Sequence, residues 1–213
     1  VCMRVVGGVD TNLTALKTFR CNFPAAEGIE GSVRSKQVLN RCAQLMAPAK
    51  NDPFPSVVLS GPPCQGFSSA GSRNPKDPRN KLLVSVAHAI AELQPRCALI
   101  ENVSMVLAKK HGERLSRFEE VLLEGKFYVQ PVLLDASEFG VSQKRKRAFF
   151  FITRDEVEEA DILKRLEAHK TPARTAKDAL HGLSIPQVRP DDYDDEKTYD
   201  GVLNHFAMQH SQE

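Results

Sequence analysis

The chain has 213 residues, of which 41% are hydrophobic and 26% charged, with a formal net charge of +2. These values are typical of one globular domain with or without a short extension, and so small a net charge does not by itself indicate a nucleic-acid partner. The longest apolar stretch, near Phe149, is too short to span a bilayer. The five cysteines are odd in number and lack CxxC spacing, which disfavours zinc and a disulfide framework and favours a reducing compartment.

Strand and helix patterns alternate along the chain, which predicts an α/β fold with a mostly parallel sheet and helices on both faces. Strands are expected at 4–10, 57–59, 97–100, 127–134 and 148–153, and helices at 13–23, 38–46, 82–93 and 115–122, the last with Gly125 as its C-cap. Beyond Arg154 the chain becomes helical and charged, and its acidic run at 191–196 is interpreted as a solvated loop. We therefore expect a domain at 1–154 and an extension at 155–213.

The most informative segment is Gly-Pro-Pro-Cys-Gln-Gly-Phe-Ser at 61–68, directly after the apolar run at 57–59. Its two prolines exclude a helix at the exit from that strand, and Gly61 and Gly66 allow tight turns on either side. Cys64 is thereby presented at the carboxyl end of a strand, where open α/β sheets bind their ligands. A buried structural cysteine is the ordinary alternative.

Two further segments favour a functional Cys64. Glu101-Asn102-Val103 ends a second strand, and Gln143-Lys144-Arg145-Lys146-Arg147 precedes a third. Taken singly, Glu101 fits an acid in a turn, and the two arginines fit a solvated basic run. Together with a thiol they predict one convergent site.

These segments resemble motifs IV, VI and VIII of DNA (cytosine-5) methyltransferases, in the same order and spacing, and the resemblance extends from about Val5 to the C-terminus. It implies a Rossmann-like methyltransferase fold that uses S-adenosyl-L-methionine. It also implies methyl transfer to carbon 5 of cytosine in DNA, through a covalent cysteine adduct on a flipped base. Double-stranded DNA is the expected partner. A restriction-modification role and a gene-regulatory role both stay open.

The resemblance implies specific roles for the motif residues. Cys64 adds to carbon 6 of the ring, Glu101 faces ring nitrogen 3, and Arg147 holds the exocyclic oxygen. Arg145 is assigned to the same site, either within the catalytic group or as a contact to the phosphate backbone. The residues that the resemblance implies for DNA binding are Gln65, Ser68, Arg79, Gln143 and Arg145.

The methyl donor is expected to contact residues near several strand ends. Asp10, at the end of its strand, fits the acid that binds ribose hydroxyls in nucleotide-binding folds. The remaining cofactor residues implied by the resemblance are Thr11, Ser32, Pro63 and Leu82. Ser32 departs from the family pattern, which usually has an aspartate there, so it would supply no charge to the adenine.

The sequence opens at Val1 within a strand pattern, and we expect a fragment whose glycine-rich motif I and target-recognition domain lie outside it. Three alternatives stay open: methylation of cytosine in transfer RNA, a non-catalytic DNA-binding paralogue, and a split enzyme with its recognition domain on a second chain. We expect a cytoplasmic, nucleoid-associated location in a bacterium and a nuclear one in a eukaryote.

Overall fold

The computed structural model describes residues 3–47, 56–63, 81–108 and 112–182, together with four two-residue strands further along the chain. Those short strands are β7 (Gln187–Val188), β8 (Thr198–Tyr199), β9 (Val202–Leu203) and β10 (Phe206–Ala207). β7 pairs with β10 in parallel, and β8 pairs with β9 antiparallel. None of the helices in the described ranges is long and apolar enough to cross a membrane.

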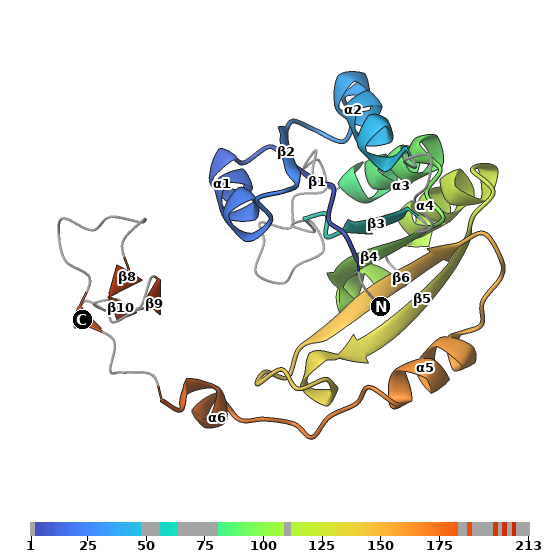
Figure 1. Cartoon of the computed structure of the whole chain (residues 1–213). Helices are drawn as coiled ribbons and strands as arrows, with labels where there is room; N and C mark the ends of the chain where they lie inside the picture. Colours follow the sequence, from blue (N-terminus) through green and yellow to red (C-terminus); the bar gives the residue numbers. More distant parts are fainter. Residues whose placement is uncertain are drawn as a thin grey trace, which may run out of the picture.

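A four-stranded sheet forms the centre of the molecule, in the order β3-β4-β6-β5 (Figure 1). Its strands are β3 (Val57–Ser60), β4 (Cys97–Val103), β5 (Tyr128–Asp135) and β6 (Lys146–Thr153). β3 and β4 are parallel, whereas β6 is antiparallel to both β4 and β5. The α/β class is confirmed, and the sheet is mixed because the short turn between β5 and β6 allows only antiparallel pairing.

The main core lies between one face of this sheet and two helices, α3 (Leu82–Leu93) and α4 (Gly112–Glu124). Every second residue of β4 and β6 faces these helices, and Ile100 and Phe150 there are fully buried. Phe118 of α4 packs edge-on against Phe150, with 5.2 Å between ring centroids. The predicted helix at 82–93 is confirmed, and β4 extends three residues beyond the prediction, through Val103.

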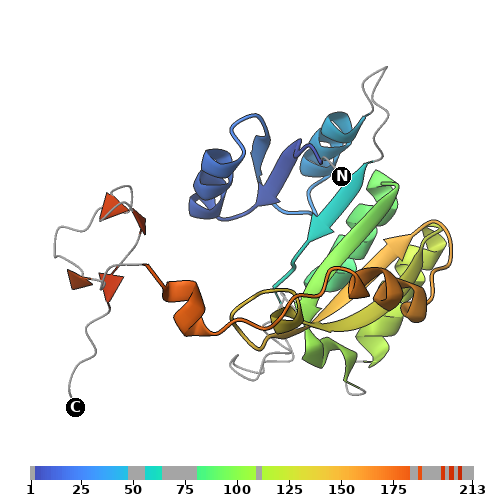
Figure 2. The same cartoon turned by 60° about the horizontal axis from the view of Figure 1, so that its bottom comes forward.

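The opposite face of the sheet is covered in part by α5 (Glu159–Glu167), which contacts β5 (Figure 2). Ile162 of α5 is buried, and so is Val132 of β5, which lies outside the main core cluster. α5 therefore packs on the sheet although it lies in the predicted extension. The remaining short elements are η2 (Ser104–Leu107), η4 (Ala136–Glu138) and α6 (Ala176–Leu180), the last with a Thr175–Asp178 capping box.

Two further strands form a separate parallel pair, β1 (Gly7–Asp10) with β2 (Glu27–Glu30), flanked by α1 (Leu13–Asn22) and α2 (Lys36–Met46). Side chains of Asn12 and Ser35 cap the two helices. The sequence analysis predicted β1 but not β2. Only Ile29 is a large apolar residue among the four residues of β2, too little for a recognisable strand pattern.

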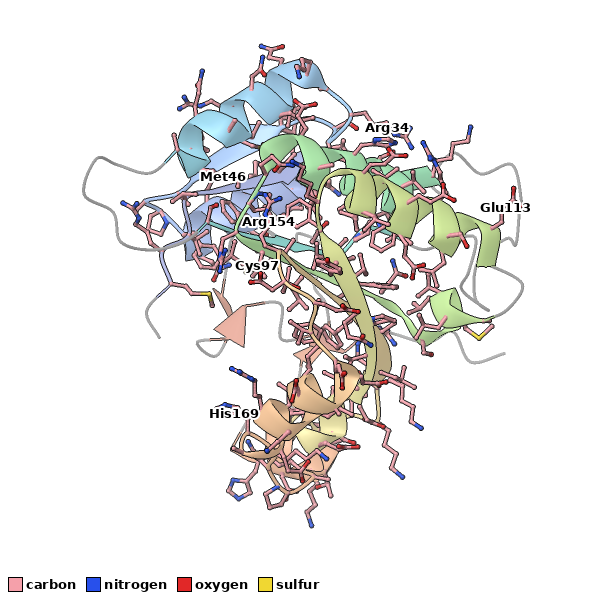
Figure 3. All side chains as sticks on the ribbon, turned by 90° about the vertical axis from the view of Figure 1, so that its right-hand side faces the viewer. Arg34, Met46, Cys97, Glu113, Arg154 and His169 are labelled. Atoms are coloured by element: carbon pink, nitrogen blue, oxygen red, sulfur yellow. The ribbon has the colours of Figure 1, made fainter. Side chains whose placement is uncertain are left out.

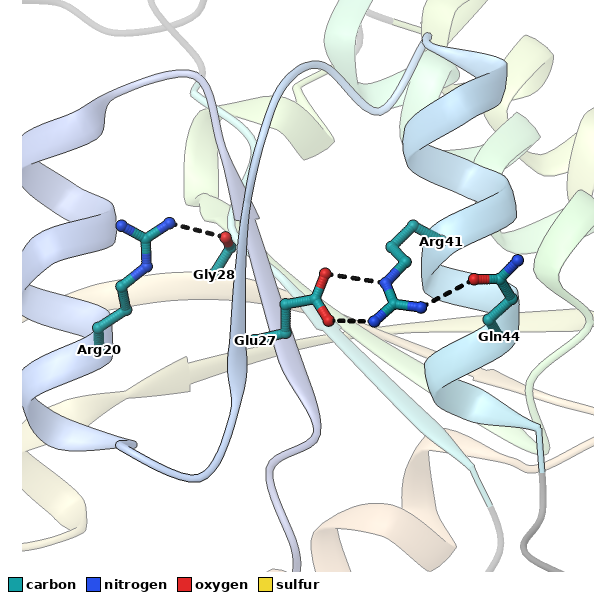
Figure 4. A network of polar contacts seen from close by, with 5 residues as sticks. All are labelled: Arg20, Glu27, Gly28, Arg41 and Gln44. Atoms are coloured by element: carbon teal, nitrogen blue, oxygen red, sulfur yellow. Dashed lines mark hydrogen bonds and ion pairs between the residues drawn. The ribbon is translucent and has the colours of Figure 1, made fainter.

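Polar contacts join α2 to β2 (Figure 4). Arg41 donates from Nε to Glu27 at 2.8 Å and from Nη1 to Gln44 at 2.9 Å. The hydrogen bond from Arg41 holds the pKa of Glu27 below its usual range. Arg20 of α1 donates to the Gly28 carbonyl at 2.9 Å, so both helices are anchored to the same strand.

β3 is the outer strand of the described sheet on its side away from β4. Val57 and Leu59 project from it with 42% and 65% of their surfaces exposed. Among the described residues, this strand therefore carries both an open hydrogen-bonding edge and two accessible apolar side chains.

Arg154, just after β6, joins the ends of α3 and α4 (Figure 3). Its guanidinium donates to Gln94 Oε1 at 2.8 Å and to the carbonyls of Pro95 and Gly125 at 3.3 Å. It also lies 3.8 Å above the centre of the Phe127 ring. The carbonyls at two helix ends thus gain a cationic partner.

Replacing Arg154 with alanine is expected to lower the free energy of unfolding by about 2 kcal/mol, because several charge-assisted bonds and a ring contact are lost together. R154K keeps the charge without the planar fork and should recover less than half of this loss. Urea denaturation followed by circular dichroism measures the effect. R165A, at an exposed position of α5, is the control and should stay within about 0.5 kcal/mol of the parent. Equal losses for R154A and R165A would contradict the assignment.

Candidate active site

The carboxyl ends of β3 and β4 lie side by side, because Ser60 pairs with Ile100 in parallel register. The next residues, Gly61 and Glu101, therefore continue level with each other. A Cβ atom placed on Gly61 would lie 3.8 Å from Glu101 Oε2. The Glu101 carboxylate thus borders the segment that leads from β3 into the Pro62–Pro63 turn.

Glu101 also forms an ion pair across the sheet. Its Oε1 lies 2.9 Å from Arg147 Nε and 3.9 Å from Arg145 Nη2. Alternation along β6 explains the pair with Arg147, because Arg147 and Phe149 share the face opposite the α3–α4 core and Phe149 pairs with Glu101. Arg145 lies two residues before Arg147, just ahead of β6. The structure therefore brings together three of the four residues assigned to catalysis.

The exposure of these side chains indicates what the pair contributes. Arg147 is 22% exposed and Glu101 39%, so solvent screens their attraction and its effect on stability is small. Arg145 is more open still, at 46%. An accessible carboxylate held by guanidinium groups on one side is suited to meeting a polar ring that enters from solvent.

Asn102 joins the same two strand ends from the other face of β4. Its side chain is 3% exposed, and Asn102 is the buried polar residue of the described ranges. Nδ2 donates to the Pro62 carbonyl at 3.4 Å, while Oδ1 accepts from the Val103 amide at 2.8 Å. The residue was noted in the sequence only as part of its motif, and the structure gives it a contact to the segment that precedes Cys64.

Some of the predicted site residues lie outside the described residues: Cys64, Gln65, Ser68 and Arg79. Pro63 is described and exposed, and Cys64 follows it directly in the chain. Gln143 is exposed in the turn between β5 and β6, two residues before Arg145. The side chain of Asp135, which the sequence analysis did not consider, accepts a bond from the Arg145 amide at 3.1 Å.

The residues predicted to bind the methyl donor lie at neighbouring strand ends. The Asp10 carbonyl accepts from the Gly31 amide at 3.0 Å, so Asp10 and Ser32 are close along the ends of β1 and β2. Asp10 Oδ1 accepts from the Asn12 amide at 2.8 Å. The side chain is exposed and its carboxylate has a second oxygen, so this acid fits a ligand that offers hydroxyl donors.

A side-chain contact connects this strand pair with α3, the helix that Leu82 begins. Arg34 Nε donates to Ser85 Oγ at 2.9 Å, and Ser85 Oγ donates to the Lys81 carbonyl at 2.9 Å. The segment after Ser32 therefore reaches the first turn of α3. Exposed Thr11 continues directly from Asp10.

Comparison with known proteins identifies the class to which this α/β fold and its strand-end site belong. Residues 2–211 match the C-5 cytosine-specific DNA methylase family, and the chain is a member of that family. Cytosine-5 methyltransferases of this fold use S-adenosyl-L-methionine as methyl donor.

Individual relatives agree with this membership. The chain is 36% identical over 143 residues to the Type II methyltransferase M.AgeI of Thalassovita gelatinovora. The aligned segment covers 67% of this chain and 32% of M.AgeI. It is 29% identical over 202 residues to M.SacI of Streptomyces achromogenes, covering 87% of this chain and 51% of M.SacI. The chain thus spans about half or less of these relatives' own length.

Solved structures show the same fold. A prophage-encoded protein of E. coli, described as a DNA modification methyltransferase, superposes with a TM-score of 0.65 at 26% identity, over 87% of this chain and 50% of that one. Spodoptera frugiperda DNMT2 superposes with a TM-score of 0.51 at 24% identity, over 71% of this chain and 43% of that one. The second likeness concerns the fold alone.

The contact from Asn102 to Pro62 leads to a stability prediction. N102A should lower the free energy of unfolding by about 1–2 kcal/mol, because two buried hydrogen bonds are lost. N102D should cost more at pH 7.5, since it places a carboxylate in a buried position beside a carbonyl oxygen. Burial raises the pKa of such a carboxyl, so the buried side chain of N102D becomes protonated and neutral as pH falls. The loss of free energy of unfolding in N102D then becomes smaller.

The difference in free energy of unfolding between N102D and N102A should therefore become smaller from pH 7.5 to pH 5.5. Urea unfolding of both variants at the two pH values measures it, and the shared acid sensitivity of the protein cancels in the comparison. A difference that widens at the lower pH would show that residue 102 does not lie in the buried environment described.

Proposed function

We propose that the protein containing this chain transfers a methyl group to carbon 5 of cytosine in double-stranded DNA. The observation that carries the proposal is the Glu101 carboxylate, paired with Arg147 and bordering Gly61 at the start of the segment that holds Cys64. The match to the family over residues 2–211 gives the reaction class.

The chemistry explains why these residue types are needed. Carbon 5 of cytosine is a weak nucleophile, and addition of the Cys64 thiolate to carbon 6 makes carbon 5 electron-rich. Glu101 would protonate or hydrogen-bond ring nitrogen 3 as charge develops there, and Arg147 would stabilise the exocyclic oxygen. Loss of the proton from carbon 5 after methyl transfer then allows the Cys64–carbon 6 bond to break.

The methyl group comes from S-adenosyl-L-methionine when that donor is bound. Asp10 is proposed to hold its ribose hydroxyls and Ser32 its adenine, with Thr11, Pro63 and Leu82 lining the pocket. Ser32 offers a hydroxyl without charge, so adenine would be held more weakly than by an aspartate. The exposed Asp10 carboxylate supports this assignment, as does the Arg34–Ser85 contact, which joins the segment after Ser32 to the helix that Leu82 begins.

The target carbon cannot be reached inside a duplex, so the base must leave the stack. Gln65, Ser68, Arg79, Gln143 and Arg145 are proposed to contact the DNA around the vacated position. Exposed Gln143 and Arg145 lie in the turn that leads into β6, the strand that carries Arg147. A second chain or a further segment is proposed to carry the domain that reads the recognition sequence, and residues 155–213 to lead towards it.

The names of the relatives favour one biological role. M.AgeI and M.SacI are Type II methyltransferases, and the identity to M.AgeI is 36%. We infer a role in a bacterial restriction-modification system, in which methylation protects a recognition site from cleavage. Gene regulation is the alternative role.

Duplex DNA that carries 5-fluorocytosine at the methylated position should trap the full-length protein covalently, because fluorine cannot leave as a proton does and the final elimination is blocked. C64S should form no adduct. Denaturing gel electrophoresis after incubation with the methyl donor measures the complex. A C64S protein that is trapped as readily as the parent would refute the role of Cys64, and a parent protein that traps no duplex from a mixed-sequence library would refute the reaction.

E101Q and R147A are each expected to reduce the methyl-transfer rate about a hundredfold or more, with a much smaller loss of DNA affinity, because their contacts strengthen as charge develops on the ring. Single-turnover kinetics and equilibrium DNA binding separate the two effects. E113Q and R117A, at two exposed positions of α4, are matched controls that should retain the parental rate. Equal losses of rate and affinity would assign Glu101 and Arg147 to DNA positioning instead.

A further inference from the structure

The turn between β5 and β6 is held at its base by one carboxylate oxygen. Asp135, the last residue of β5, pairs in register with Lys146, the first residue of β6. Its Oδ1 accepts from the Ser137 amide at 3.1 Å, the Ser137 hydroxyl at 2.8 Å and the Arg145 amide at 3.1 Å. One oxygen thus joins the start of the turn to its end.

The bond to Arg145 fixes the residue that enters β6 beside the candidate site. The Arg145 amide donates to Asp135, and the Arg145 carbonyl accepts from the Ala136 amide at 3.0 Å. Both polar backbone groups of Arg145 are therefore held by residues 135 and 136. From this position its guanidinium reaches to 3.9 Å from Glu101 Oε1.

The far side of the turn has separate anchors. The Glu138 carbonyl accepts from the Thr171 amide at 2.9 Å, and the Glu138 carboxylate lies 3.1 Å from Lys170 Nζ. β5 and β6 pair along their whole length, and Phe150 and Ile152 of β6 are fully buried in the core. The hairpin is therefore held together by more than Asp135, whose bonds act locally on Arg145 and the first residues of the turn.

The environment of Asp135 agrees with an acceptor role. Bonds from the Ser137 amide and hydroxyl, followed by the Arg145 amide and the charge of Lys146, hold the pKa of this carboxyl below its usual range. All three recorded bonds end on Oδ1. An asparagine side chain offers an oxygen at the same position, so it is able to accept the same three bonds without charge.

We propose that Asp135 is a positioning residue for the methyl-transfer site: its Oδ1 orients the Arg145 backbone and so sets how Arg145 and neighbouring Gln143 meet the target strand. This inference rests on the proposed function, because the target strand is DNA only if the protein methylates DNA. It assigns to Asp135 no contact with substrate or methyl donor.

Three variants of the full-length protein test the proposal: D135A, D135N and S137A. D135A removes the acceptor, D135N keeps it without charge, and S137A removes only the hydroxyl donor. D135A is expected to slow single-turnover methylation about tenfold or more, which is the effect of a misplaced contact in a preorganised site. D135N should stay within about twofold of the parent, and S137A should lie between them.

A second measurement does not depend on activity. Amide hydrogen exchange, resolved by mass spectrometry over residues 136–147, should be faster in D135A and unchanged in D135N, while exchange in α3 stays as in the parent. Hydrogen exchange separates the positioning role of Asp135 from the proposed methyl-transfer function. Absence of methylation and trapping in the parent protein would refute the proposed function, whereas the exchange pattern reports on the positioning of Arg145 in either case.

Several outcomes would overturn the proposal. These are a D135A protein with parental rate and exchange, a D135N protein as impaired as D135A, or a loss of rate in D135A that matches only its loss of folded protein by circular dichroism. If D135A does not fold, S137A decides the test: a methylation rate below that of D135N together with faster exchange at 136–147 supports the acceptor role, and unchanged exchange there overturns it. E156A, an exposed acid after β6, is the control and should match the parent throughout.

Discussion

The antiparallel pairing of β4 with β6 supports both the core and the candidate site, because the two faces of this strand pair carry different residues. On one face, Ile100, Phe150 and Ile152 are buried beneath α3 and α4. On the other, Glu101 meets Arg147 at 2.9 Å. A slip of one residue in register would exchange the two faces, placing charges in the core and aromatic rings at the site. Burial of the apolar face therefore fixes the geometry of the polar one.

This arrangement explains how accessible charges are held in place with little energy of their own. The Glu101–Arg147 pair is too exposed to contribute much to stability, and its geometry comes from the backbone that carries it. Asn102 and Asp135 act on that backbone at two points, Pro62 beside β3 and Arg145 before β6. The exposed side chains of the site are thus positioned through the backbone by buried Asn102 and half-buried Asp135.

The sequence was sufficient to predict the elements whose signal is local and strong. α3 has a regular apolar face, β6 has a run of aromatic residues, and the segments around Glu101 and Arg147 have a distinctive order along the chain. β2 was missed because four residues with one large apolar side chain carry no periodicity. Arg154 was missed for a different reason: its partner Gln94 lies 60 residues away, and only the fold brings them together. Asp135 carried one usable signal, an aspartate at a strand end with a serine two residues later, and both residue types are common in turns.

The exposed edge of β3 has a consequence for handling the protein. Among the described residues, β3 has no strand partner on this edge, and such an edge beside the accessible Val57 and Leu59 side chains is a template for backbone hydrogen bonds from another extended chain. At high concentration these 213 residues alone would bring such edges from different molecules into contact, and their association would grow steeply with concentration. The strand that leads into the candidate site is then also the segment through which copies of this chain would associate.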